Sequence, residues 1–234
     1  MSDIINRPNT FLNNGKPFII FLDGTDGVGK STIAKELKLK YNQMGFYTDT
    51  TCIMKFTEAG YMIRDIAITE PMQDEILFLG FCFSVFYNLK KIIENKKSLQ
   101  VMIVDRSPAS TFAQNIAAPH IPERTKSSMF EIFDSLQKKF NTENKDSFAN
   151  FLLELDPKIA FERIKQSRKE LDVYEQRGIE FQRRIASGYR THYEVNNNPL
   201  NTIINTENTT ITKVVDLIYQ NTVEHVKCHL TKNT

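Results

Sequence analysis

The chain has 234 residues, with 30 Lys and Arg against 28 Asp and Glu, and a formal net charge of +2. Hydrophobic residues make up 41%, which is typical of one soluble globular domain and excludes a disordered chain. The small net charge disfavours a nucleic-acid binder. Three cysteines cannot form a disulfide framework, which favours an intracellular, cytoplasmic protein. No apolar run approaches the roughly 18 residues of a membrane span, so we expect no membrane partner.

The predicted elements alternate between strands and helices. Residues 1–16 are polar and aperiodic, and we expect a flexible extension there before a single domain over residues 17–234. The run 18–22 is continuously apolar, which is typical of a parallel strand buried on both faces. Further strands are predicted at 47–54, 101–104, 148–155 and 202–204, and helices at 31–43, 75–95, 158–166, 176–193 and 212–227. Residues 141–147 are predicted as the longest loop. This alternation predicts an α/β fold with a mostly parallel sheet.

One motif carries a specific chemistry. Residues 24–31 match G-x-x-x-x-G-K-[ST], directly after the first strand and at the start of a helix. Backbone N–H groups of such a loop point inward and bind anions, aided by the positive end of the helix. Lys30 is predicted to bridge the β- and γ-phosphates, and Ser31 to ligate Mg²⁺. The predicted ATP-binding residues are Gly24, Thr25, Asp26, Gly27, Val28, Gly29, Lys30, Ser31 and Thr32.

The remaining sequence narrows the class of P-loop protein. A GTPase needs an N-K-x-D element, but residues 95–98 end in Ser and residues 144–146 are wrong by one position. Outside the P-loop, no Gly has an Asp three residues before it, so the D-x-x-G switch is missing. Motor and AAA-type ATPases normally need a longer chain. A small kinase therefore remains.

Two further elements suit phosphoryl transfer. Asp105 and Arg106 follow the strand 101–104, where strand ends line the ligand crevice of a parallel sheet. The carboxylate can hold Mg²⁺ through water, and the guanidinium can bind phosphate. Residues 161–172 contain a basic cluster that includes Arg163 and Arg168. This cluster is either a mobile segment that closes over phosphates or a solvated helix face with local ion pairs.

Three segments together resemble the thymidylate kinase family of nucleoside monophosphate kinases. They are FIIFLDGTDGVGKST (18–32), VMIVDRSPAST (101–111) and the stretch 151–193, which contains FLLELDPKIAFERI. The resemblance implies a P-loop NTPase fold with a five-stranded parallel sheet flanked by helices and a mobile lid near 164–175. It also implies transfer of the ATP γ-phosphoryl to a deoxynucleoside monophosphate, most simply dTMP to give dTDP, with Mg²⁺.

The resemblance also assigns roles to residues. Asp26 matches an acidic position near the substrate's sugar, and Arg106 matches the Arg that contacts the acceptor phosphate. Family members with Gly at the Gly27 position place the catalytic Arg in the lid, here Arg163 or Arg168. The implied catalytic residues are Lys30, Asp105, Arg106, Arg163 and Arg168. The implied Mg²⁺ ligands are Ser31 and, through water, Asp105.

Several substrate-reading positions depart from the family pattern. Lys55 stands where the family has Arg, Gln114 where it has Tyr, and Val173 where the lid has Arg. The long helix lacks the base-reading Arg, and Phe83 is predicted to stack on the base instead. The predicted substrate-binding residues are Asp26, Lys55, Phe83, Arg106, Ser110 and Gln114.

Alternative functions stay open on the sequence. Asp105-Arg106-Ser107 also resembles deoxynucleoside kinases, in which Glu58 would be the base for a sugar 5′-hydroxyl. A nucleotide-binding module without turnover is the non-enzymatic alternative. In each case the partners are small-molecule nucleotides. The apolar residues around helix 75–95 further predict a homodimer, which the family also uses.

Overall fold

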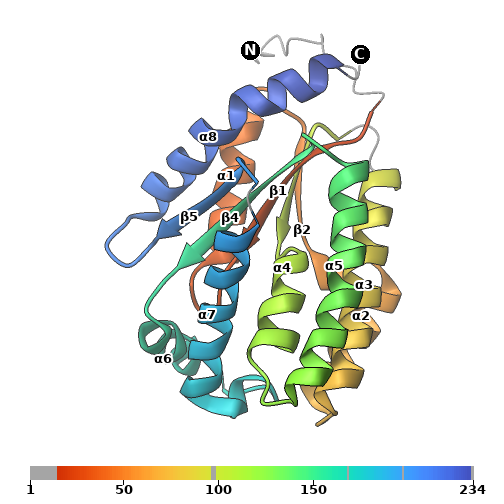
Figure 1. Cartoon of the computed structure of the whole chain (residues 1–234). Helices are drawn as coiled ribbons and strands as arrows, with labels where there is room; N and C mark the ends of the chain where they lie inside the picture. Colours follow the sequence, from red (N-terminus) through yellow and green to blue (C-terminus); the bar gives the residue numbers. More distant parts are fainter. Residues whose placement is uncertain (1–14, 96–98, 168, 197, 233–234) are drawn as a thin grey trace.

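The computed structural model describes residues 15–95, 99–167, 169–196 and 198–232. A five-stranded sheet with strand order β2-β3-β1-β4-β5 forms its centre, and all of its pairings are parallel (Figure 1). The strands are β1 (Phe18–Asp23), β2 (Thr48–Cys52), β3 (Val101–Asp105), β4 (Phe148–Glu154) and β5 (Asn201–Asn205). The predicted α/β fold with a parallel sheet is confirmed. The predicted extension 1–16 lies almost wholly outside the described residues.

Helices cover both faces of the sheet. One face carries α1 (Lys30–Gln43) and α8 (Ile211–Lys232) (Figure 1). The larger helices of the other face are α2 (Glu58–Thr69), α3 (Asp74–Asn95), α5 (Glu123–Glu143) and α7 (Gly178–Val195). Shorter helices are η1 (Ile53–Lys55), α4 (Pro108–Thr111), η2 (Phe112–Ala117), α6 (Pro157–Ser167) and η3 (Glu175–Arg177).

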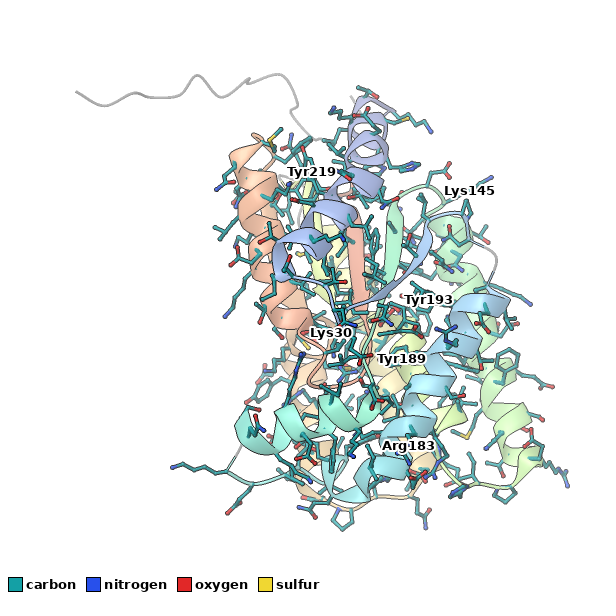
Figure 2. All side chains as sticks on the ribbon, turned by 90° about the vertical axis from the view of Figure 1, so that its left-hand side faces the viewer. Lys30, Lys145, Arg183, Tyr189, Tyr193 and Tyr219 are labelled. Carbon is teal, nitrogen blue, oxygen red and sulfur yellow. The ribbon has the colours of Figure 1, made fainter. Side chains whose placement is uncertain are left out.

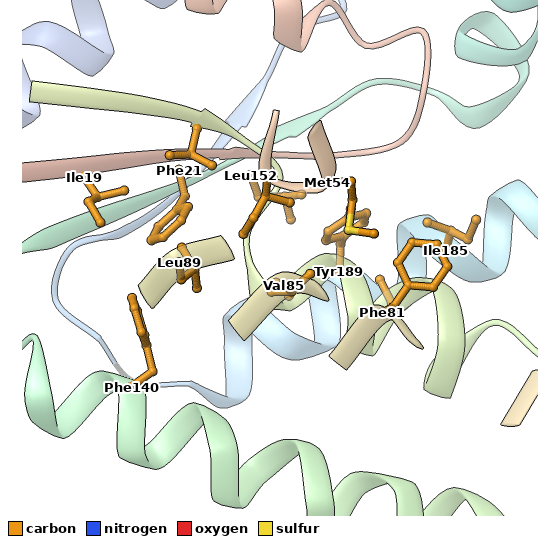
Figure 3. Packing of buried hydrophobic residues seen from close by; sticks show 14 of the residues in the cluster. Ile19, Phe21, Met54, Phe81, Val85, Leu89, Phe140, Leu152, Ile185 and Tyr189 are labelled. Atoms are coloured by element: carbon orange, nitrogen blue, oxygen red, sulfur yellow. The ribbon is translucent and has the colours of Figure 1, made fainter. Parts of the chain in front are cut away.

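The central strand β1 is buried along its whole length and divides two apolar cores. Successive side chains of a strand point to opposite faces. Ile20 and its alternate neighbours therefore pack with α1 and α8, whereas Ile19 and Phe21 pack with α3, α5 and α7. Figure 3 shows the second core, with Val85 and Leu89 of α3 and Tyr189 of α7 around the sheet. A strand that is apolar on both faces is the expected centre of such a layered fold.

The strand register brings the polar ends of three strands to one edge. Asp105 lies opposite Leu22 of β1 on one side and Cys52 of β2 on the other. The P-loop follows β1, and Arg106 follows β3. Groups far apart in the sequence therefore meet at the carboxyl edge of the sheet, where ligands bind in this class of fold.

The structure also corrects some sequence expectations. Helices α2 and α5 occupy stretches where no helix is predicted. Among the described side chains of α2, only Gly60 and Ala67 are buried, so its apolar pattern is too sparse to recognise. The predicted loop 141–147 begins inside α5, which ends at Glu143. The predicted strand 47–54 ends at Cys52, where the chain turns into η1.

Helix α3 is more apolar than the sequence analysis allowed. An 18-residue window within Asp74–Glu94 has a mean hydropathy of 1.6, enough by length and composition alone for a membrane span. Ser84 and Asn88 interrupt its apolar run, so the sequence contains no continuous apolar stretch of that length. Half of the window is buried in the fold, as in core helices of soluble proteins. We therefore describe α3 as a core helix.

Candidate active site

The P-loop joins β1 to α1, and its backbone passes so close to α6 that position 27 has no room for a side chain. Gly27 has φ +81°, and a Cβ there would lie 2.3 Å from the carbonyl oxygen of Ala160 in α6. Lys30 is buried and donates hydrogen bonds to the carbonyl oxygens of Gly24 (3.0 Å) and Thr25 (2.8 Å). Burial lowers the pKa of Lys30, and nearby Arg106 lowers it further, while Asp26 opposes both. The ammonium is thus held inside the loop, where a phosphate would be bound (Figure 2).

Ser31 and Asp105 form an oxygen-rich corner beside the P-loop. Ser31 Oγ donates a 2.9 Å hydrogen bond to Asp105 Oδ2. Asp105 Oδ1 is buried and has no hydrogen-bond partner among the described residues. Mg²⁺ prefers oxygen ligands and is usually held by one or two protein groups together with substrate phosphates and water. The described residues contain no cluster of three or more His, Cys, Asp or Glu for a metal, so this corner is an open site rather than a protein cage.

Arg106 is fixed by contacts on three sides. Its backbone has φ 76°, and its N–H donates to the carbonyl oxygen of Leu22 at 2.9 Å. Its guanidinium donates to Asp26 Oδ1 at 2.5 Å and to the hydroxyl of Tyr189 at 3.1 Å. Burial alone lowers the pKa of Arg106, but the Asp26 carboxylate and other neighbours hold it well above its ordinary value. Arg106 is therefore a permanent cation of defined orientation.

Asp23 anchors the loop that carries Arg106, a role that sequence reasoning missed. Its buried carboxylate accepts hydrogen bonds from Ser107 N (2.9 Å), Ser107 Oγ (2.5 Å) and the hydroxyl of Tyr193 (2.7 Å). Tyr193 and Tyr189 both lie on α7 (Figure 2). Burial raises the pKa of Asp23, although these hydrogen bonds lower it. The one sequence signal for this role is an acidic residue that ends a fully apolar strand.

Lys30, Ser31, Asp105 and Arg106 line one cavity of about 500 Å³. It brings together most of the predicted residues from the P-loop, the β3 end, η1, α4, η2 and α6. The predicted residues that line it are Asp26, Gly27, Gly29, Lys30, Ser31, Thr32, Lys55, Asp105, Arg106, Ser110, Gln114 and Arg163. Gly24 and Thr25 line a neighbouring cavity of about 430 Å³ beside the ends of β4 and β5. Val28 does not reach either cavity and packs in the α1 core.

Phe81, and not the predicted Phe83, is the phenylalanine of α3 that lines the cavity. Phe83 is 55% exposed, stacks on Tyr87 with ring centroids 5.4 Å apart, and does not line the cavity. Phe81 lines it and meets Tyr174 edge to face. Residues two positions apart on an α-helix are rotated by about 200° about the helix axis. The side chains of Phe81 and Phe83 therefore point to opposite sides of α3. The expectation of a base contact from Phe83 is therefore corrected.

The basic residues of α6 lie partly at the cavity, as a phosphate-binding segment would, and partly on a solvated face with local ion pairs. Arg163 lines the cavity, as a cation that closes over phosphates should. Lys165 instead pairs with Glu162 at 2.9 Å on the exposed face. Arg168 lies outside the described residues. Arg163 is therefore the predicted lid arginine that the described residues place at the cavity.

Arg64 is a cavity residue that the sequence analysis missed. It is half-buried on α2, lines the cavity and forms no ion pair with a described carboxylate. The sequence does not predict its helix and so carries no signal that would bring Arg64 to the site.

The residue proposed as base in the deoxynucleoside kinase alternative lies away from the cavity. Glu58 is exposed and does not line the cavity. The deoxynucleoside kinase alternative therefore lacks its proposed base.

Comparisons with known proteins agree with this geometry. The family model for thymidylate kinase matches residues 22–218. Two thymidylate kinases of Leptospira interrogans serogroup Icterohaemorrhagiae (serovars copenhageni and Lai) are each 26% identical over 173 residues, covering 70% of this chain and 76% of the relative. The solved thymidylate kinase of Candida albicans shares the fold, with a TM-score of 0.66, 20% identity and 94% of each chain covered. The chain belongs to the thymidylate kinase family, whose members are ATP-dependent phosphotransferases.

Proposed function

We propose that the protein transfers the γ-phosphoryl group of ATP to the 5′-phosphate of dTMP, forming dTDP and ADP in nucleotide biosynthesis. The observation that carries this proposal is the single cavity lined by Lys30, Arg106, Lys55 and Arg64. A phosphate monoester is mostly dianionic at neutral pH and is itself the nucleophile. It needs cations that hold it in line with the γ-phosphate rather than a general base.

Each cation takes a role that fits its position. The P-loop amides and Lys30 bind the β- and γ-phosphates of ATP, since Lys30 already points into the loop. Arg106 binds the acceptor phosphate, and Asp26 fixes its orientation through the 2.5 Å ion pair. Arg163 reaches the cavity from α6 and stabilises the charge of the transferring group. The oxygens of Ser31 and Asp105 would hold Mg²⁺, which neutralises charge on the phosphate oxygens when it is bound.

The acceptor base fits the apolar part of the same cavity. Phe81, Ile68, Tyr174 and Ile185 form this wall. Gln114 and Ser110 add polar groups that can hydrogen-bond to the base or the sugar. A cavity lined by both apolar side chains and cations matches a nucleoside monophosphate.

We also propose a cytoplasmic homodimer. Four exposed apolar side chains form a stripe along α3, at Ile76, Leu79, Phe83 and Tyr87. Their spacing of three and four residues places them on one helix face, and exposed apolar patches of this kind mark protein interfaces. Light scattering tests the dimer, and a monomer at micromolar concentration would remove it.

A substrate panel tests the reaction. The protein is incubated with ATP and Mg²⁺ and with nucleosides or nucleoside monophosphates, and ADP and the phosphorylated products are measured. We expect dTDP from dTMP and no product from thymidine. The Lys30→Ala variant is the control for contaminating kinases. Phosphorylation of nucleosides alone would contradict the proposal, and ATP binding without turnover on any acceptor would support the non-catalytic alternative.

A further inference from the structure

A polar joint, formed by Ile53, Thr57, Ser84 and Asn88, links η1 and the start of α2 to α3. Asn88 of α3 is fully buried, and its Nδ2 donates to the carbonyl oxygen of Ile53 at 2.6 Å and to Ser84 Oγ at 3.3 Å. Its Oδ1 accepts a hydrogen bond from Thr57 Oγ1, and Thr57 Oγ1 in turn accepts from Gly60 N at 3.2 Å. Thr57 is the N-cap of α2. One side chain therefore ties η1 and the start of α2 to α3.

Gly60 shows how closely this joint is packed. A Cβ at Gly60 would lie 2.3 Å from Asn88 Nδ2, 2.9 Å from Ser84 Oγ and 3.0 Å from the carbonyl oxygen of Met54. A side chain at this position would therefore displace the Asn88 amide or shift α2 itself. The position of α2 is thus set by side-chain hydrogen bonds and by direct backbone contact.

The joint places two cations of the cavity. Lys55 follows Ile53 by two residues in η1, and Arg64 follows Gly60 by four residues, so Gly60 and Arg64 lie on the same face of α2. Phe81, which lines the cavity, lies on the Asn88 face of α3 at a spacing of seven residues. Lys55, Arg64 and Phe81 are therefore carried by the elements that Asn88 joins.

We propose that Asn88 is a positioning residue for the acceptor nucleotide, acting through Thr57 and Ile53 on Arg64 and Lys55. This inference rests on the proposed function of the cavity as the acceptor site. Without the amide, the start of α2 and η1 lose their shared anchor, and the two cations move relative to Arg106. The P-loop is not part of the joint, so ATP binding keeps its geometry.

The test compares variants that remove or keep the joint. Asn88→Leu removes all of the side-chain hydrogen bonds while keeping a γ-branched side chain, and Thr57→Val removes the linking hydroxyl, whereas Thr57→Ser keeps it. The control is Thr222→Val on α8, which removes a buried hydroxyl that contacts Tyr41 on the opposite face of the sheet. KM for dTMP and for ATP, kcat and Tm are measured for each variant.

Asn88→Leu and Thr57→Val are expected to raise KM for dTMP by at least about tenfold, because small displacements of binding groups have large effects, while KM for ATP changes less than about twofold. Thr57→Ser should resemble the wild type, and Thr222→Val should lower Tm with both KM values unchanged. An unchanged KM for dTMP in Thr57→Val, or a parallel rise for both substrates, overturns the inference. Thr57 is only partly buried, so the comparison of Thr57→Val with Thr57→Ser tests the inference if Asn88→Leu does not fold. A wild type that phosphorylates no monophosphate overturns the proposed function instead, and the inference with it.

Discussion

Ser31 and Asp105 are joined by a 2.9 Å hydrogen bond across 74 positions of the chain. Ser31 lies in the first turn of α1 and Asp105 ends β3, so the bond links the P-loop to the neighbouring strand. Asp105 keeps a second, buried oxygen without a partner among the described residues. This arrangement leaves one carboxylate oxygen to fix the hydroxyl and one for a further ligand.

The first prediction concerns this corner. Asp105→Asn keeps the size of the side chain but removes its charge, and we expect the apparent affinity for Mg²⁺ to fall by about 10–100-fold. The measurement is a Mg²⁺ titration of kinase activity at fixed ATP. Glu58→Gln, a substitution of an exposed carboxylate outside the cavity, is the control. A titration curve for Asp105→Asn that overlies the wild type would contradict the proposed Mg²⁺ role.

The second prediction concerns Arg106. Arg106→Ala removes the cation assigned to the acceptor phosphate, and we expect turnover to fall by about 10³-fold or more, as for other arginines at transferring phosphates. Circular dichroism should show a folded protein, and ATP binding by calorimetry should persist because Lys30 and the P-loop are intact. Turnover equal to that of the wild type would rule out the assigned role. Arg183→Ala, at an exposed residue of α7, is the matched control.

The third prediction separates two aromatic residues of α3. Phe81→Leu should raise KM for dTMP by about 5–150-fold, the range expected for the loss of one base-stacking contact of about 1–3 kcal/mol. Phe83→Leu should leave KM unchanged, because Phe83 lies on the other side of the helix. Steady-state kinetics with dTMP at saturating ATP measure both. The reverse order of effects would restore the sequence-based choice of Phe83.

The fourth prediction concerns pH and stability. His192 is buried among Phe112, Phe133 and Tyr193, and burial lowers its pKa from 6.5 to about 4. The folded state therefore favours the neutral ring, whereas the unfolded chain protonates His192 below pH 6.5. The contribution of the neutral ring to the free energy of unfolding is complete above pH 6.5 and is lost as the pH falls towards 4. A shift of this size corresponds to a loss on the order of 3 kcal/mol.

His192→Gln should therefore lose less free energy of unfolding between pH 7 and pH 4 than the wild type does. Urea unfolding at several pH values measures the difference. His225→Gln, at an exposed position of α8, should keep the wild-type pH dependence. Equal pH dependence in His192→Gln and the wild type would show that the ring does not titrate as described.

The sequence predicts the part of the site that follows local rules. The P-loop has a fixed spacing, and Asp105 and Arg106 end an apolar strand, so parallel-sheet topology alone brings them together. The acceptor side follows no such rule. Arg64 reaches the cavity only because α2 packs on α3, and the choice between Phe81 and Phe83 depends on how α3 is rotated about its axis. Both are tertiary properties that a residue pattern does not contain.

The close approach of Gly27 to the carbonyl oxygen of Ala160 limits which residues position 27 can carry. The backbones of the P-loop and α6 touch at this point, so a longer residue at position 27 requires that α6 first move away. Because α6 also carries Arg163, a Gly27→Arg substitution would displace the helix that brings the proposed transition-state cation to the cavity. A cation at position 27 and the present position of α6 therefore exclude each other unless the backbone rearranges.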